Sequence, residues 1–117
     1  MPERIRTTVT TAADGSATAY VGTGLNGCVA SITYTKTDYA AGVDFAITVE
    51  STGESLWTQN DVNASATVYP VQKGNLGGTG TASTITEVPM FVANDRVKIV
   101  IASGGNAKVG TFDVVIA

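Results

Sequence analysis

The chain has 117 residues, of which 44% are hydrophobic and 15% charged, and its formal net charge is −3. This length suits one domain with a single core, and the composition excludes the highly charged type of chain that stays disordered. No basic stripe is present to bind a phosphate backbone, and no apolar run approaches the roughly 20 residues of a membrane helix, so we expect neither nucleic acid nor a membrane as a partner.

The N-terminal third of the sequence predicts three strands. Residues 5–11 and 16–21 flank Asp14-Gly15, a dipeptide that favours tight turns, and this spacing predicts a β-hairpin. Residues 28–36 then alternate with a period of two, which predicts a further strand.

The middle of the sequence contains the clearest strand, at residues 43–50. Val43, Phe45, Ile47 and Val49 share one face of it, and the residues between them share the other. Shorter strands are predicted at residues 55–59, 64–69 and 84–92. The glycine-rich and threonine-rich segment 73–83 is predicted to be a mobile loop, because glycine loses much conformational freedom in a strand.

The C-terminal part predicts a second hairpin. Residues 96–102 and 109–116 flank Ser103-Gly-Gly-Asn106, whose glycines tolerate the backbone angles of a tight reversal. We therefore predict an all-β fold, a single-domain β-sandwich or jelly-roll-like barrel of about eight short antiparallel strands that covers residues 1–117. Residues 1–11 would form an N-terminal arm or an edge strand.

The residue inventory argues against catalysis. Histidine is absent, which removes the commonest general base, and Cys28 is the only cysteine, so no internal disulfide can form. Cys28 lies on the same predicted face as Ile32, and we expect a buried, unreactive thiol. The sequence therefore predicts a protein that is not an enzyme.

Three short motifs have better structural than chemical explanations. Gly22-Thr-Gly-Leu-Asn-Gly27 has the spacing of a dinucleotide-binding loop, but a predicted strand follows it where a helix is needed. Asp38 and Asp44 match no metal-ligand spacing, so we expect no metal and no cofactor. Asn63-Ala-Ser65 is a formal glycosylation sequon, yet the first six residues lack the apolar stretch of a signal peptide, and we expect folding in a cytoplasm.

The candidate interaction residues come from three places. The N-terminal segment 1–11 and the loop 73–83 are long enough to reach a neighbouring molecule, and Trp57 with nearby tyrosines could serve a core, a protein interface or a sugar-binding platform. From these segments we select Ile5, Arg6, Thr7, Trp57, Asn75 and Leu76 as the candidate interface.

Three longer segments resemble a known class of proteins. Residues 6–20 (RTTVTTAADGSATAY), 31–50 (SITYTKTDYAAGVDFAITVE) and 93–100 (ANDRVKIV) together are similar to small virion proteins of tailed bacteriophages, most specifically head decoration or cement proteins. The likeness covers most of the chain and rests on overall texture, without a diagnostic motif.

The resemblance implies a β-rich, often jelly-roll-like protein on the exterior of a capsid. Such proteins commonly sit as trimers over junctions in the lattice of the major capsid protein and lock neighbouring capsomers after expansion. Two other functions stay open: a tail or head–tail joining component of the virion, and a carbohydrate-binding module that uses Trp57.

Overall fold

The computed structural model describes residues 2–117. Every regular element in this range is a β-strand, and every pairing is antiparallel. The strands are β1 (Glu3–Thr10), β2 (Ala17–Lys36), β3 (Asp44–Val49), β4 (Ser55–Gln59), β5 (Ala66–Val68), β6 (Val71–Asn75), β7 (Ala82–Ala102) and β8 (Val109–Ile116). The predicted all-β class is confirmed.

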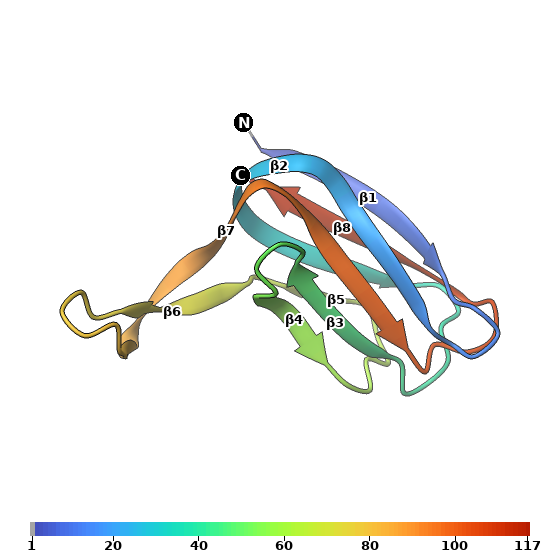
Figure 1. Ribbon diagram of the computed structural model, residues 1–117. Coiled ribbons are helices and arrows are strands. Elements are labelled where there is room, and N and C mark those ends of the chain that lie inside the picture. The colour runs from blue at the N-terminus through green and yellow to red at the C-terminus, as the bar shows by residue number, and fades with distance from the viewer. Residues whose placement is uncertain (1) are drawn as a thin grey trace.

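One continuous sheet folds over onto itself along β2 (Figure 1). Its order is β1-β8-β2-β7-β3-β4, with β5 beside β2 and β6 beside β7. Residues 17–21 of β2 pair with the C-terminal part of β7, whereas residues 29–36 pair with β8. One layer therefore contains β4, β3, β7 and the start of β2, and the other contains β1, β8, the end of β2 and β5. This two-layer arrangement is consistent with the predicted β-sandwich.

Aromatic side chains join the two layers. Tyr34 of β2 and Phe112 of β8 come from one layer, Phe45 of β3 comes from the other, and all three are buried. The ring centroids of Tyr34 and Phe45 lie 4.7 Å apart, and those of Phe45 and Phe112 lie 5.1 Å apart, both edge to face. Such pairs add about 0.5–1.5 kcal/mol each beyond the burial of their surface.

Two strands are much longer than the sequence predicts. β2 has 20 residues and β7 has 21, and each replaces two predicted short strands. At the bend in β2 the register shifts between Val21 and Asn26, and Gly22 and Gly24 have φ angles of 81° and 62°. Because side-chain-bearing residues rarely adopt these angles, the glycines let the strand turn without leaving the sheet. The same strand continues after Gly27, so the helix that a dinucleotide site needs does not follow.

Both predicted hairpins are wrong. β1 pairs with β8 rather than β2, and the C-terminal part of β7 pairs with β2 and β3 rather than β8. The connection between β1 and β2 and the connection between β7 and β8 each cross from one layer to the other. They form hydrogen bonds with each other: the Gly104 N–H donates to the Gly15 carbonyl at 2.9 Å, and the Thr11 N–H donates to the Lys108 carbonyl at 2.9 Å. Their glycines supply the positive φ of tight turns, which explains why the sequence resembles two hairpins.

The predicted face of residues 28–36 is correct only from Ile32 onward. Ile32 and Val29 are both buried, whereas Cys28 is half-buried. The register shifts between Val29 and Ser31, and the extra residue reverses the alternation of side chains. Cys28 thus lies on the opposite face from Ile32, and the prediction of a fully buried thiol is wrong.

Candidate interaction surface

A two-stranded ribbon projects from one end of the sandwich (Figure 1). We use "the ribbon" for β6, the first part of β7 up to Pro89, and the turn between them. Its strands pair Val71 with Pro89, Gln72 with Val88 and Lys73 with Glu87. From Met90 onward β7 pairs with β2 and enters the body of the protein. With the ribbon, the molecule measures 49 Å along its long axis and 29 and 22 Å across.

The predicted loop 73–83 forms the outer part of the ribbon. Residues 73–75 belong to β6 and residues 82–83 to β7, so the prediction that glycine prevents strand formation is wrong at both ends. The turn between them is closed by the Leu76 N–H, which donates to the Thr81 carbonyl at 2.8 Å. The Asn75 side-chain amide also donates to the Gly80 carbonyl at 2.7 Å. The predicted interface residues Asn75 and Leu76 therefore lie at the ribbon tip.

Large apolar side chains are concentrated in solvent on and beside the ribbon. The exposed fraction is 88% for Ile85, 54% for Leu76 and 51% for Val71. Phe91 and Tyr69, which flank the ribbon in sequence, are 59% and 72% exposed. Of the exposed large hydrophobic residues in the described chain, only Tyr20 lies elsewhere. Clustered exposed apolar surface of this kind marks interaction sites.

The N-terminal candidates lie in edge strand β1, which pairs with β8 along its whole length. Ile5 and Thr7 are half-buried, whereas Arg6 is exposed. The Arg6 guanidinium forms two hydrogen bonds with the carboxylate of Asp113 on β8, at 2.9 and 3.0 Å. This guanidinium holds the pKa of Asp113 below its usual range. Arg6 thus contributes to the attachment of the edge strand.

Trp57 lies in the core. Its side chain is 6% exposed, and its ring packs edge to face on Phe45 with centroids 5.3 Å apart. Two of the tyrosines that could have formed a sugar-binding platform with Trp57, Tyr34 and Tyr39, are buried as well. The hypothesis that Trp57 presents an exposed aromatic platform is therefore wrong, and its place among the candidate interface residues is corrected to a core position.

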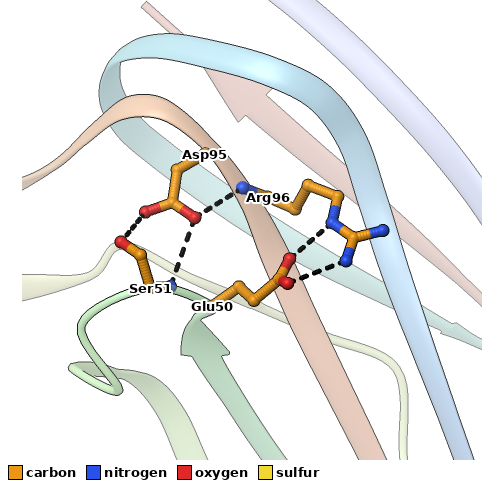
Figure 2. A network of polar contacts seen from close by, with 4 residues as sticks. All are labelled: Glu50, Ser51, Asp95 and Arg96. Atoms are coloured by element: carbon orange, nitrogen blue, oxygen red, sulfur yellow. Dashed lines mark hydrogen bonds and ion pairs between the residues drawn. The ribbon is translucent and has the colours of Figure 1, made fainter.

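A polar network ties the turn after β3 to the bend in β7 (Figure 2). The buried carboxylate of Asp95 accepts hydrogen bonds from the Ser51 N–H at 3.2 Å, the Arg96 N–H at 2.8 Å and the Ser51 hydroxyl. The Arg96 guanidinium forms two hydrogen bonds with Glu50 and lies 4.2 Å from the ring centroid of Tyr20.

The network keeps its two acids ionised. The Ser51 hydroxyl holds the pKa of Asp95 below its ordinary value, and Arg96 does the same for the pKa of Glu50. A carboxylate whose pKa is lowered in this way is a weak base near neutral pH. The arrangement explains how the turn is fastened to the strand, and it favours a structural role.

The sequon residues have a structural role that the sequence analysis missed. The Asn63 side-chain oxygen accepts a hydrogen bond from the Gly42 N–H at 2.7 Å, and the Ser65 hydroxyl oxygen accepts one from the Lys36 N–H at 2.9 Å. These bonds fasten the connection between β4 and β5, which belong to different layers. The signal available in the sequence was the polar, turn-forming composition of this segment.

Comparisons of the chain with protein families, with curated proteins and with solved structures find no match. Residues 2–117 contain no helix that is long and apolar enough to cross a bilayer. Within the same range, no three histidine, cysteine or acidic side chains gather into a group that could hold a metal ion, and no pocket is found. The ribbon is the candidate functional surface because it exposes large apolar side chains.

Proposed function

We propose that the chain is a structural virion protein of a tailed bacteriophage that decorates the capsid and stabilises it by binding the major capsid protein lattice. Two observations support this function: the resemblance of residues 6–20, 31–50 and 93–100 to head decoration proteins, and a projecting ribbon on a well-packed sandwich. The ribbon carries the proposal, because it presents apolar anchors away from the body.

The ribbon tip suits contact with a neighbouring protein. Leu76 and Ile85 are exposed and would lose water on docking, and full burial of a Leu or Ile side chain contributes about 1.5–3 kcal/mol. Among residues 2–117, each strand of the ribbon also has one edge without a β-ladder partner, so main-chain hydrogen bonds can add to the side-chain contacts.

Stabilisation of a shell requires many weak contacts rather than one strong contact. A lattice repeats the same docking surface, and a protein that touches more than one subunit gains avidity without a new type of contact. The cross-layer aromatic packing keeps the body in one shape, which reduces the entropy that ordering would cost on binding.

Binding to expanded, undecorated heads tests the proposal. The wild-type chain should bind saturably, and the Leu76→Asp/Ile85→Asp variant should bind at least about tenfold more weakly, equivalent to about 1.4 kcal/mol. A Thr8→Asp/Thr10→Asp variant, changed at two exposed positions of β1, is the matched control and should bind like the wild type. Absence of saturable wild-type binding, or full binding by the tip variant, would contradict the proposal.

A count of copies per particle separates decoration from a tail or head–tail joining role. Decoration predicts a copy number that follows the number of capsid subunits. A small fixed number set by the symmetry of the tail axis would overturn the decoration proposal and favour a tail component.

A further inference from the structure

The ribbon joins the body at a point where both of its strands change partner. β7 pairs with β6 as far as Pro89 and with β2 from Met90 onward. The other side of the ribbon pairs with β2 up to Val68, in β5, and with β7 from Val71 onward, in β6. Both ladders are thus interrupted at the same level, and such element ends are where a hinge between rigid parts forms.

A proline lies in each strand at this junction. The chain has three prolines, and two of them are Pro70, the residue before β6, and Pro89, the residue of β7 that pairs with Val71. The third, Pro2, lies before β1. Pro70 is buried, and so is Met90, the residue after Pro89. Each strand therefore leaves the body beside a proline and a buried side chain.

Proline restricts the backbone at the positions where a hinge would need to move. Its ring fixes φ at about −65°, and it also disfavours helical angles in the residue before it. Pro70 therefore restrains Tyr69 as well as itself, and these two residues form the link between β5 and β6. Pro89 restrains Val88 of β7 in the same way. The backbone rotations that would tilt the ribbon are thus reduced in both strands at once.

The angle of the ribbon matters because its tip is far from the junction. The five residues of β6 span about 17 Å, so a rotation of about 10° at the junction moves the tip by about 3 Å. A gap of about 1 Å already removes up to about half of the van der Waals attraction between two atoms. A ribbon at a fixed angle also loses less freedom on docking than a ribbon that swings.

We propose that Pro70 and Pro89 are positioning residues that hold the ribbon at a fixed angle to the body and so pre-organise its tip for docking. The consequence for docking rests on the proposed function, in which the tip meets the capsid lattice. The prolines lie at the base of the ribbon, whereas Leu76 lies at its tip. Replacing them should therefore loosen the ribbon and leave its apolar tip in place.

A distance between two spin labels tests the angle of the ribbon without any capsid. The parent chain carries Cys28→Ser, so its two thiols come from Thr86→Cys, at an exposed position of the ribbon, and Thr35→Cys, at an exposed position of β2. Electron paramagnetic resonance should give one narrow distance distribution in this parent. With Pro70→Gly/Pro89→Gly added, the distribution should become at least about twice as wide, because glycine frees φ in both strands.

Two controls separate positioning from stability. Tyr39→Phe removes a hydrogen bond inside the body and should lower the melting temperature while the distribution stays narrow. Pro2→Gly makes the same chemical change outside the ribbon and should change neither. Pro89→Gly alone changes an exposed position, so it should fold, and it should widen the distribution part of the way. A broad distribution in the parent, or an equally narrow one in every chain, would overturn the proposal.

Binding to expanded heads tests the consequence for docking. Pro70→Gly/Pro89→Gly keeps Leu76 and Ile85, yet it should bind at least about fivefold more weakly than the wild type, because its ribbon loses more freedom on docking. Binding equal to that of the wild type would refute the positioning role. If the wild type itself fails to bind, the proposed function is wrong, and the distance distributions still decide whether the prolines hold the ribbon.

Discussion

At the residue scale, the two stacked tyrosines of the core differ in how their hydroxyl groups are satisfied. Tyr34 and Tyr39 are both buried, with ring centroids 5.9 Å apart. The Tyr39 hydroxyl donates a hydrogen bond of 2.7 Å to the Val9 carbonyl, whereas the Tyr34 hydroxyl has no hydrogen-bond partner among residues 2–117. Burial raises the pKa of both phenols, so both hydroxyl groups stay protonated near neutral pH.

This difference predicts opposite effects of the same substitution. Tyr34→Phe removes an unsatisfied buried group and should leave the free energy of unfolding unchanged or raise it by up to about 1 kcal/mol. Tyr39→Phe loses a hydrogen bond to β1 and should lower the free energy of unfolding by about 1–2 kcal/mol. Urea denaturation of the two variants measures both values. A larger loss for Tyr34→Phe than for Tyr39→Phe would contradict the hydrogen-bond assignment.

The individual side chains show what the sequence could and could not predict. The buried face of Val43, Phe45, Ile47 and Val49 is as predicted, because nothing interrupts the alternation of β3. The position of Trp57 was not predictable, since an amphipathic aromatic ring suits both a core and a surface platform. Leu56 and Trp57 are consecutive and both buried, which happens because a register shift in the pairing of β4 with β3 breaks the alternation.

At the element scale, the ion pair between Arg6 and Asp113 makes the attachment of β1 to β8 depend on pH. The Arg6 guanidinium lowers the pKa of Asp113 in the folded protein, so the folded state binds fewer protons than the unfolded state in the acidic range. Its contribution to stability is therefore complete above the ordinary aspartate pKa of about 3.9, and it is lost as the pH falls through the lower folded pKa.

The predicted outcome is a melting temperature that falls with pH below about 4, and that falls less steeply in Asp113→Asn. Arg6→Gln should reduce the slope in the same way. Arg4→Gln is the matched control on the same strand. The charge of Arg4 also lowers the pKa of Asp113, but its effect is weaker than that of Arg6. Circular dichroism melts from acidic to neutral pH measure the slopes, and equal slopes in all chains would contradict the role of the pair.

The strands themselves were predictable, but their partners were not. Alternation located most of the strand residues, since the period of two depends only on the local sequence. The pairing of β1 with β8 and of β2 with β7 joins segments far apart in the chain and depends on which apolar faces meet in the core. The turn dipeptides indicated reversals correctly and could not show that each reversal crosses between layers.

At the scale of the whole molecule, the sequence did not show whether residues 73–83 form a contact surface or a flexible loop. The glycine content of residues 73–83 suggested mobility, yet the first and last of these residues are strands of the ribbon. The apolar residues that identify the ribbon as a surface are scattered through the sequence as Tyr69, Val71, Leu76, Ile85 and Phe91. Only the antiparallel pairing brings them to one end of the molecule, so the site could not be assembled from spacing alone.

The whole molecule thus consists of a well-packed body that holds its shape and a ribbon that presents apolar surface. The body has its aromatic core between two layers and its turns bonded to one another. The ribbon has two strands, and within the described part of the chain β6 pairs only with β7, so its amides have few neighbours to protect them. If the protein acts by binding another protein through the ribbon, binding should reduce the solvent exposure of the ribbon and leave that of the body unchanged.

Hydrogen–deuterium exchange of the chain, free and bound to expanded heads, tests this claim most directly. We expect slow amide exchange in the body in both states, fast exchange at the tip of the ribbon in the free dilute protein, and strong protection of residues 71–89 on binding. Protection confined to β1 or β4, with unchanged exchange in the ribbon, would contradict it.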